Sequence, residues 1–303
     1  MTGATGTIGR VLVEHLLEAG DEVTVLSRDP ARAREALGDR VEAFDWPDPG
    51  REPPPAEALR GRDGVVNLMG ERLDQRWSDR AKREIRESRV LGTGSLVAAL
   101  GDLAQGDRPA VLVSQSASGF YGARGEEPVE ESQPPGDDFL ARVVKEWEAA
   151  GRQAERLGMR VATTRTGVIL SESGGAVRKM LTPFKLGVGG PVAGGRQYLP
   201  WVHVDDVAGA IGFCLRSRDA SGPINVCAPE PATNADFSKT LGRALRRPAV
   251  LPVPALALKL LYGEMAQVVT TGVRMVPARL LALGYRFRWP DLERALRDAT
   301  GST

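Results

Sequence analysis

The chain has 303 residues, of which 42% are hydrophobic and 26% charged, and its formal net charge is +1. This balance is ordinary for a globular protein and excludes a generally basic binder of nucleic acid or of membrane surfaces. Cys214 and Cys227 lie in apolar segments, which favours core packing over a disulfide framework or a metal site. No apolar run could span a bilayer and no signal peptide is recognisable, so we expect a cytoplasmic protein without a membrane partner.

The chain opens with a glycine-rich loop, MTGATGTIGR, in which glycines recur at every third residue. In such a loop the first glycine permits a tight turn, the second lets the backbone approach a pyrophosphate, and the third lets a helix pack closely on its sheet. Backbone N–H groups at the helix start then face the phosphates. The segment therefore predicts a dinucleotide-binding loop whose contacts come from Gly3, Thr5, Gly6, Thr7 and Ile8.

An amphipathic helix is expected over 8–19, ended by Gly20 and followed by a buried strand over 23–26. A loop of this kind normally follows an apolar strand of about five residues, whereas nothing precedes Met1 and Thr2 in this sequence. We expect such a strand ahead of Thr2, in the middle of the sheet. Without it, its two neighbours would leave rows of backbone groups unpaired.

Further strands are predicted over 64–68, 110–114 and 161–164, and further helices over 79–100, 138–156 and 206–215. This alternation predicts an α/β fold with a parallel, doubly wound sheet. From Ser171 glycine and proline become frequent, and helical patterns dominate from Asn234. We therefore predict a dinucleotide-binding domain over 1–170, completed by about 201–220, and a smaller substrate-binding lobe formed by 171–200 and 221–303.

Distinctive stretches lie at 67–71 (NLMGE), 88–93 (SRVLGT), 114–122 (SQSASGFYG) and 200–207 (PWVHVDDV), and others continue nearly to the C-terminus. Together they resemble the extended short-chain dehydrogenase/reductase superfamily. More narrowly, they resemble its sugar-nucleotide-epimerase-like branch, some of whose members are labelled cell division inhibitors. The resemblance implies a Rossmann domain and a C-terminal epimerase-associated domain, and it leaves the substrate open.

The resemblance also bears on which cofactor is bound. In relatives that prefer NAD, an acidic residue at the end of the second strand binds the ribose diol. This sequence has Ser27 followed by Arg28 at that place. A carboxylate would repel a 2′-phosphate, whereas a hydroxyl and a guanidinium can bind one, so we expect NADP(H) in preference to NAD(H). The alternative is that Arg28 is a solvated turn residue, and the nearby Asp29 weakens the inference slightly.

Further residues are assigned to the cofactor by the same resemblance. Two residues that follow the third strand are expected to border the adenine. Three residues at the end of the next strand are expected to pass the adenosine ribose. An arginine in the cleft would suit a phosphate or carboxylate on the ligand. The alternatives are an Asx turn at the pair and an ordinary turn glycine after the strand. In that order, the residues are Asp45 and Trp46, then Asn67, Leu68 and Gly70, then Arg165.

The resemblance also suggests where catalytic residues would lie. Relatives that transfer hydride use a serine or threonine after the fifth strand and a Tyr-x-x-x-Lys pair on the next helix. Ser116 fits the serine place best, but Leu140 and Val144 stand at the two dyad places, and Lys145 is rotated by about 100° around the helix. We therefore expect the dyad to be absent. Tyr121 is the nearest phenol that could face the cleft, although in relatives it mainly shapes the pocket.

The segment WVHVDD contains one of the two histidines of the chain, His203. We favour a structural role for it, with Asp205 or Asp206 capping a helix that starts at Val207, because a capped helix explains both acids. The candidate residues of the substrate cleft are Gln197, Trp201 and His203.

These features predict an NADP(H)-binding, epimerase-like protein that acts on an unknown small molecule as a monomer or homodimer. It would be an oxidoreductase or a nucleoside-diphosphate-sugar epimerase. The alternative is a non-catalytic protein that senses NADP(H) or binds a regulatory partner. The missing dyad favours the alternative, whereas the retained cleft motifs favour an enzyme.

Overall fold

The computed structural model describes residues 1–172 and 174–302, without the side chains of residues 175–179. Within this part of the chain the main sheet is entirely parallel, with the order β2–β1 on one side and β3–β4–β5–β9 on the other. The doubly wound α/β fold is thereby confirmed. The strands are β1 (Val23–Ser27), β2 (Val41–Asp45), β3 (Gly64–Asn67), β4 (Val111–Ala117), β5 (Arg160–Thr166) and β9 (Gly222–Val226).

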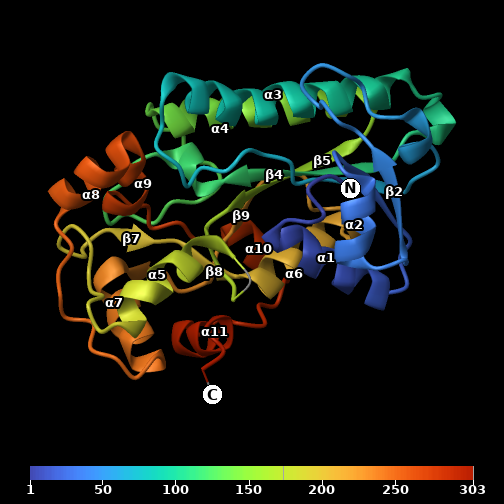
Figure 1. Ribbon diagram of the computed structural model, residues 1–303. Helices are drawn as coiled ribbons and strands as arrows, with labels where there is room; N and C mark the ends of the chain where they lie inside the picture. Colours follow the sequence, from blue (N-terminus) through green and yellow to red (C-terminus); the bar gives the residue numbers. More distant parts are fainter. Residues whose placement is uncertain (173, 303) are drawn as a thin grey trace.

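Helices cover both faces of this sheet (Figure 1). One face carries α3 (Asp79–Asp102) and α4 (Phe139–Arg152), and the other carries α1 (Thr7–Glu18) and α6 (Val204–Arg216), while α2 (Pro30–Leu37) connects the first two strands. Side-chain caps fix several helix starts, because Asp29, Ser78 and Asp138 each accept a bond from the backbone N–H three residues later.

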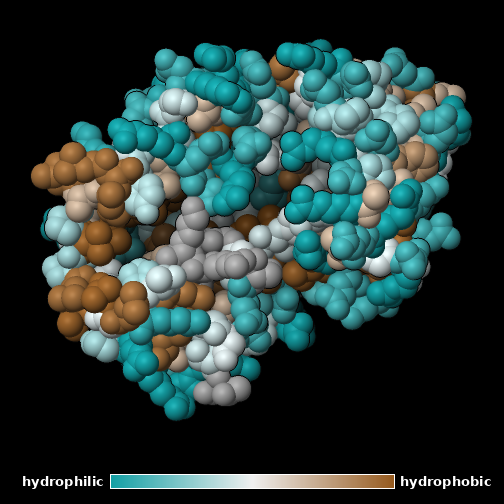
Figure 2. Space-filling view, in the orientation of Figure 1, coloured by the Kyte–Doolittle hydropathy of each residue, from teal (hydrophilic) through white to brown (hydrophobic). Residues whose placement is uncertain are grey.

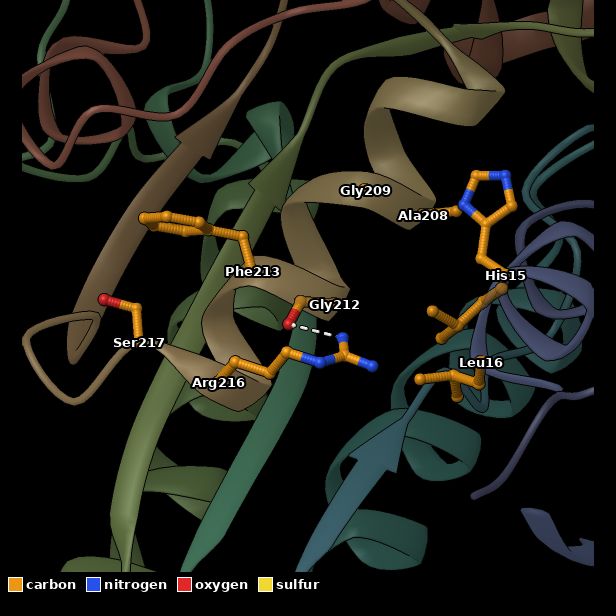
Figure 3. A pocket seen from close by; sticks show the side chains of 9 residues that line it. His15, Leu16, Ala208, Gly209, Gly212, Phe213, Arg216 and Ser217 are labelled. Carbon is orange, nitrogen blue, oxygen red and sulfur yellow. Dashed lines mark hydrogen bonds between the residues drawn. The ribbon is translucent and has the colours of Figure 1, made fainter. Parts of the chain in front are cut away.

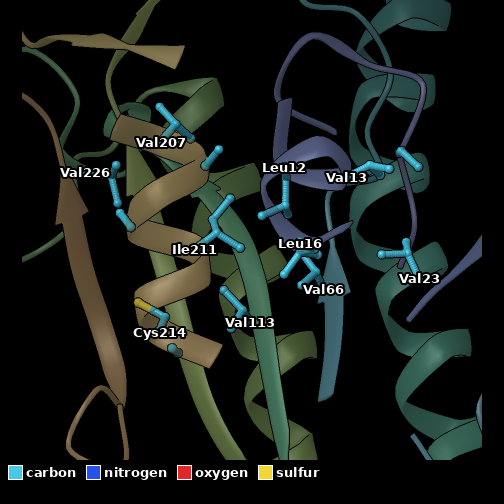
Figure 4. Packing of buried hydrophobic residues seen from close by; sticks show 14 of the residues in the cluster. Leu12, Val13, Leu16, Val23, Val66, Val113, Val207, Ile211, Cys214 and Val226 are labelled. Atoms are coloured by element: carbon cyan, nitrogen blue, oxygen red, sulfur yellow. The ribbon is translucent and has the colours of Figure 1, made fainter. Parts of the chain in front are cut away.

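Strand alternation divides the core between the two faces of the sheet. Val111 and Val113 of β4 point to the α1 and α6 side, whereas Leu112 packs under α3. Val66 and Val65 of β3 alternate in the same way. Figure 4 shows the hydrophobic core on the α1 and α6 side, in which Leu12 and Leu16 of α1 and Ile211 of α6 pack against the sheet.

At the centre of the sheet, β1 and β3 do not pair with each other directly. Thr2 bridges Leu26 on one side and Asn67 on the other, and its N–H donates to the carbonyl of Val66 at 2.9 Å. A cavity of about 440 Å³ lies next to this bridge, between the remaining parts of the two strands. The strand expected ahead of Thr2 stays a prediction.

The later part of the chain forms short strand pairs and helices. β6 (Val168–Leu170) pairs in parallel with β8 (Trp201–His203), and β7 (Tyr198–Leu199) pairs antiparallel with β10 (Ala232–Thr233). The helices are α5 (Gly175–Lys185), α7 (Asn234–Ala244), α8 (Ala255–Tyr262), α9 (Gln267–Thr270), α10 (Ala278–Ala282) and α11 (Leu292–Ala299). Short 3₁₀ turns are η1 (Ala56–Ala58), η2 (Gln105–Asp107), η3 (Ser118–Tyr121), η4 (Gln153–Leu157) and η5 (Gly263–Ala266).

Two details differ from the sequence-based expectations. The segment 222–226, which we assigned to the smaller lobe, is β9 and lies beside β5 in the main sheet. The helix expected from Val207 begins at Val204 and is capped by His203, whose Nδ1 accepts the N–H of Asp205. The acids are used elsewhere, because Asp206 accepts the backbone N–H groups of Arg288 and Trp289. The division into two domains itself stays a prediction.

The surface is polar over most of the visible face, with hydrophobic side chains gathered over α8 and near the end of α7 (Figure 2). On α8, Leu256, Leu260 and Leu261 are about two-thirds exposed or more, at 68%, 72% and 67%. None of the helices in the described part of the chain combines the length and hydrophobicity needed to cross a bilayer.

Candidate functional site

The glycine loop passes directly over the end of β3. Gly3 has a φ of +65°, and a Cβ built on it would lie 2.7 Å from the carbonyl oxygen of Leu68. A Cβ on Gly9 would lie 2.3 Å from the carbonyl oxygen of Gly3, so the first turn of α1 is pressed against the loop. No side chain caps α1 at Gly6. The start of α1 therefore keeps the geometry that binds a pyrophosphate.

Replacing Gly9 with alanine should destabilise the protein by about 1–3 kcal/mol, because the added methyl group meets backbone atoms that cannot move aside. Urea unfolding followed by circular dichroism measures the change. Gly94→Ala is the matched control, since Gly94 lies in α3 and a Cβ there meets nothing within 4 Å. That control should be neutral or stabilising. Equal stability of Gly9→Ala and the wild type would contradict the packing described here.

The end of β1 presents one exposed cation. Arg28 is exposed, and its side chain makes no hydrogen bond or ion pair with any described residue. The neighbouring carboxylate of Asp29 accepts the N–H of Arg32 at 3.0 Å as the cap of α2. The hydroxyl of Ser27 bonds the backbone of Asp29. Asp29, the acidic residue nearest the place where NAD-preferring relatives bind the ribose diol, is thus already engaged as the cap of α2.

The residues predicted beside the adenosine have different environments. Asp45 is exposed at the end of β2, whereas Trp46 is buried in the core and its indole N–H donates to the carbonyl of Glu52 at 2.8 Å. Asn67 is fully buried: its amide donates to Thr93, and its side-chain oxygen accepts the hydroxyl of Thr2, both at 2.8 Å. These two side chains are therefore engaged in packing, and their cofactor contacts stay predictions.

A cleft of about 380 Å³ lies at the carboxyl ends of β3, β4 and β5. Leu68 and Gly70 line it after β3, and Ser116 lines it on β4. Residues from later in the chain also line it, namely Tyr198, Pro200, Gln267 and Thr271. In open α/β sheets, ligands bind at this edge, so the cleft and the glycine loop together form the candidate site.

Helix α4 presents an apolar face to the cleft. Leu140 and Val144, at the places of the usual dyad, both line it together with Trp147. Lys145 is exposed and is not among the lining residues. The one-residue shift along the helix thus points the lysine away, as helical geometry requires.

Beneath the cleft lies a buried ion pair between Arg165 of β5 and Glu148 of α4. The arginine is 3% exposed and binds the carboxylate through two parallel N–H···O bonds of 2.8 and 2.9 Å. Its guanidinium carbon also lies 3.5 Å from the ring centre of Phe120. The hydroxyl of Ser116 donates to the same carboxylate at 2.6 Å. Ser116 is therefore held from below by a charged group.

Tyr121 belongs to the same buried network. Its hydroxyl donates to the side-chain oxygen of Asn225 at 2.7 Å and accepts an N–H of Arg165 at 2.9 Å. Burial raises the pKa of Tyr121 to about 12. Neither Tyr121 nor Arg165 lines the cleft: the hydroxyl of Tyr121 is bonded to Asn225 and Arg165, and the guanidinium of Arg165 is bonded to Glu148. The geometry therefore offers no direct contact of Tyr121 with a ligand, and both residues' assigned roles stay predictions.

The three candidate residues of the substrate cleft are not among the residues that line it, and their roles stay predictions. Trp201 is buried, and its indole N–H donates to the carbonyl of Glu230 at 3.1 Å. Gln197 donates to the carbonyls of Val192 and Val269. His203 is buried and lies 3.0 Å from Asp298, which holds α11 against the start of α6.

Another hollow, of about 430 Å³, lies between α1 and α6, away from the glycine loop. Figure 3 shows His15 and Leu16 of α1 facing Ala208 and Gly212 of α6. Small residues on α6 open this groove, and Arg216 bonds back to its own helix at Gly212. Neither this groove nor any other part of the described chain holds a group of three side chains suited to a metal ion.

Known proteins resemble this chain over nearly its whole length. A model of the NAD dependent epimerase/dehydratase family matches residues 1–227, and a model called a domain of unknown function (DUF1731) matches residues 253–299. The Arabidopsis thaliana epimerase family protein SDR39U1 homolog, chloroplastic, is 38% identical, covering 98% of this chain and 85% of that protein. The Mus musculus epimerase family protein SDR39U1 is 35% identical, covering 98% and 97%.

The fold of this chain is also similar to that of a solved relative. The human epimerase family protein SDR39U1 (isoform 2), crystallised with NADPH, superimposes with a TM-score of 0.87 at 34% identity. The match covers 100% of this chain and 98% of that chain. The resemblance inferred from the sequence motifs is thereby confirmed.

Proposed function

The chain belongs to the NAD-dependent epimerase/dehydratase family, and from this premise we propose that it binds NADP(H) in preference to NAD(H). We also propose that it is an oxidoreductase or epimerase acting on a small molecule. The solved relative contains NADPH, which supports a dinucleotide in the cleft of this chain. The observation that carries the preference is Arg28, an exposed cation at the end of β1 whose acidic neighbour is held by a helix cap.

Reduced or oxidised nicotinamide would supply or accept hydride in such a reaction. The protein's own contribution begins with Ser116, a polar residue of β4 that lines the cleft next to Gln115. A serine hydroxyl has one proton to donate, and here that proton bonds to Glu148. The remaining lone pairs of Ser116 can accept a bond from a substrate hydroxyl. Glu148, which is itself bonded to Arg165, thus orients the Ser116 hydroxyl and determines where its lone pairs can accept a bond from the substrate.

This proposal predicts how turnover depends on the residues near the missing dyad. In an assay across carbonyl compounds and sugar nucleotides with NADPH and NADP⁺, Lys145→Ala should leave kcat/KM unchanged. Ser116→Ala should lower it by about 10²-fold, the usual cost of misplacing a substrate. Circular dichroism and NADPH titration serve as controls for folding and cofactor binding. Turnover abolished by Lys145→Ala alone, with both controls intact, would refute this account.

The non-catalytic alternative is supported by a specific observation, namely the apolar side chains of Leu140 and Val144 at the dyad places in the cleft wall. Neither can exchange a proton. A protein of this kind would bind NADP(H) tightly and report its level to a partner. Tight NADPH binding without turnover of any substrate in the same assay would favour this alternative over the enzyme.

We propose that the protein acts in the cytoplasm. We also propose that it is a monomer or a homodimer. Both cysteines, Cys214 and Cys227, are buried thiols, and burial raises the pKa of Cys214 to about 12. Thiols of this kind are inert packing groups. The Arabidopsis thaliana relative carries the description chloroplastic, so location differs among relatives of similar sequence. Size-exclusion chromatography with light scattering gives the oligomeric state.

A further inference from the structure

Arg89 is a second cation in the candidate site, and it reaches the cleft from α3. Its side chain lines the cleft together with Val143, Val144 and Trp147 of α4. The guanidinium carbon lies 5.3 Å from the ring centre of Trp147. Figure 1 shows α3 and α4 running together over the same face of the sheet. The arginine therefore lies beside the place where the usual dyad would stand.

The hydrogen-bond partners of Arg89 are neutral. One terminal N–H donates to the carbonyl of Ile85 at 3.1 Å, and the other donates to the carbonyl of Glu71 at 2.9 Å. A guanidinium carries five N–H groups, so three are left without a partner in the described part of the chain. Burial lowers the pKa of Arg89 to about 10, and the charge of Glu71 opposes this shift without forming an ion pair.

Gly70 makes room for this guanidinium. A Cβ built on Gly70 would lie 2.9 Å from the guanidinium carbon and 3.0 Å from a terminal nitrogen of Arg89. The φ of Gly70 is not positive, so the backbone alone does not require glycine there. The glycine that ends the β3 motif thus admits a cation to the edge of the cleft.

The environment of Arg165 offers a comparison, because its charge is paired with a carboxylate inside the protein. Arg165 is neutralised by a two-bond contact with Glu148, whereas Arg89 has no carboxylate partner among the described residues. Half-buried and buried charges are costly unless they are paired. We propose that Arg89 binds an anionic oxygen group of a ligand in the cleft. The group is either the diphosphate of the dinucleotide or a carboxylate or phosphate on the substrate.

The proposal rests on the proposed function, in that the cleft takes a dinucleotide and a substrate. Two titration series distinguish the two sources of the anion. In the first, NADPH is titrated against the wild type, Arg89→Gln and Arg89→Lys. In the second, benzoate and phenyl phosphate are titrated against the same proteins, free and saturated with NADPH. Benzamide, which is neutral and of similar shape, serves as the reference ligand.

Charge-assisted bonds of this kind correspond to about 10- to 100-fold in affinity. If the anion belongs to the dinucleotide, Arg89→Gln weakens NADPH by that factor and Arg89→Lys recovers part of it. If the anion belongs to the substrate, NADPH binding is unchanged, and the preference of the wild type for benzoate or phenyl phosphate over benzamide disappears in Arg89→Gln. In either case a lysine should restore binding in part, because it restores the charge.

Arg86→Gln is the matched control, because Arg86 is an exposed residue of the same helix that pairs with Glu146. Gly70→Ala provides a second test should Arg89→Gln fold poorly, since it displaces the guanidinium and should weaken the same ligand. Unchanged affinity for every probe, or equal losses in the glutamine and lysine variants, would overturn the proposal. Failure of the wild type to bind either dinucleotide would instead refute the proposed function, and the benzoate series on the free protein would still test Arg89.

Discussion

Replacing Arg165 with methionine is expected to destabilise the protein by about 3–5 kcal/mol, the usual cost of breaking a buried ion pair by removing one partner. The change leaves the carboxylate of Glu148 buried, with only the hydroxyl of Ser116 still bonded to it. It also removes the N–H that Tyr121 accepts. Urea unfolding monitored by tryptophan fluorescence gives the free energy of unfolding.

An exposed ion pair provides the control for this experiment. Arg80 pairs with Glu84 on the surface of α3, and Arg80→Met should change the stability little, because solvent screens such pairs. The double variant Arg165→Met with Glu148→Leu should recover part of the lost stability, since no charge is then left unpaired. Equal stability of Arg165→Met and the wild type would show that the buried pair does not hold β5 and α4 together.

Arg28→Ala is expected to weaken NADPH binding by about 10- to 100-fold and to leave NADH binding unchanged, because NADPH alone carries the 2′-phosphate. Fluorescence titration of each cofactor measures both affinities. Arg40→Ala is the control: this exposed arginine lies at the opposite, N-terminal end of β2, far from the edge where cofactors bind. An equal loss of NADH affinity in Arg28→Ala would mean that Arg28 does not recognise the 2′-phosphate specifically.

Much of the fold could be predicted from sequence because local patterns dictate it. The strand at 23–26 is observed as β1, the helix expected over 79–100 is α3, and the glycine loop has the close packing that its glycines imply. We assigned Gly222–Val226 to the smaller lobe, whereas this segment is β9 and pairs with β5 in the main sheet. Its partner, β5, ends more than fifty residues earlier, and such long-range pairing leaves no local signal.

The site was less predictable, for a physical reason. Sequence supplies residue types, whereas their roles depend on which side chains meet across the fold. Ser116, Glu148 and Arg165 come from separate elements, and only the sheet brings them together. Arg89 was part of a motif without an assigned role, because its distinguishing property, the lack of a carboxylate partner, exists only in three dimensions. The start of α6 at Val204 was missed because His203, rather than an acid, caps the helix.

The most direct test of the central claim is titration of the wild-type protein with NADPH and with NADH under one salt concentration. The account predicts that NADPH binds at least about tenfold more tightly, because Arg28 is exposed at the end of β1 and Asp29 is held as a helix cap. Salt should reduce the NADPH affinity more than the NADH affinity. Equal affinities, or tighter binding of NADH, would contradict it.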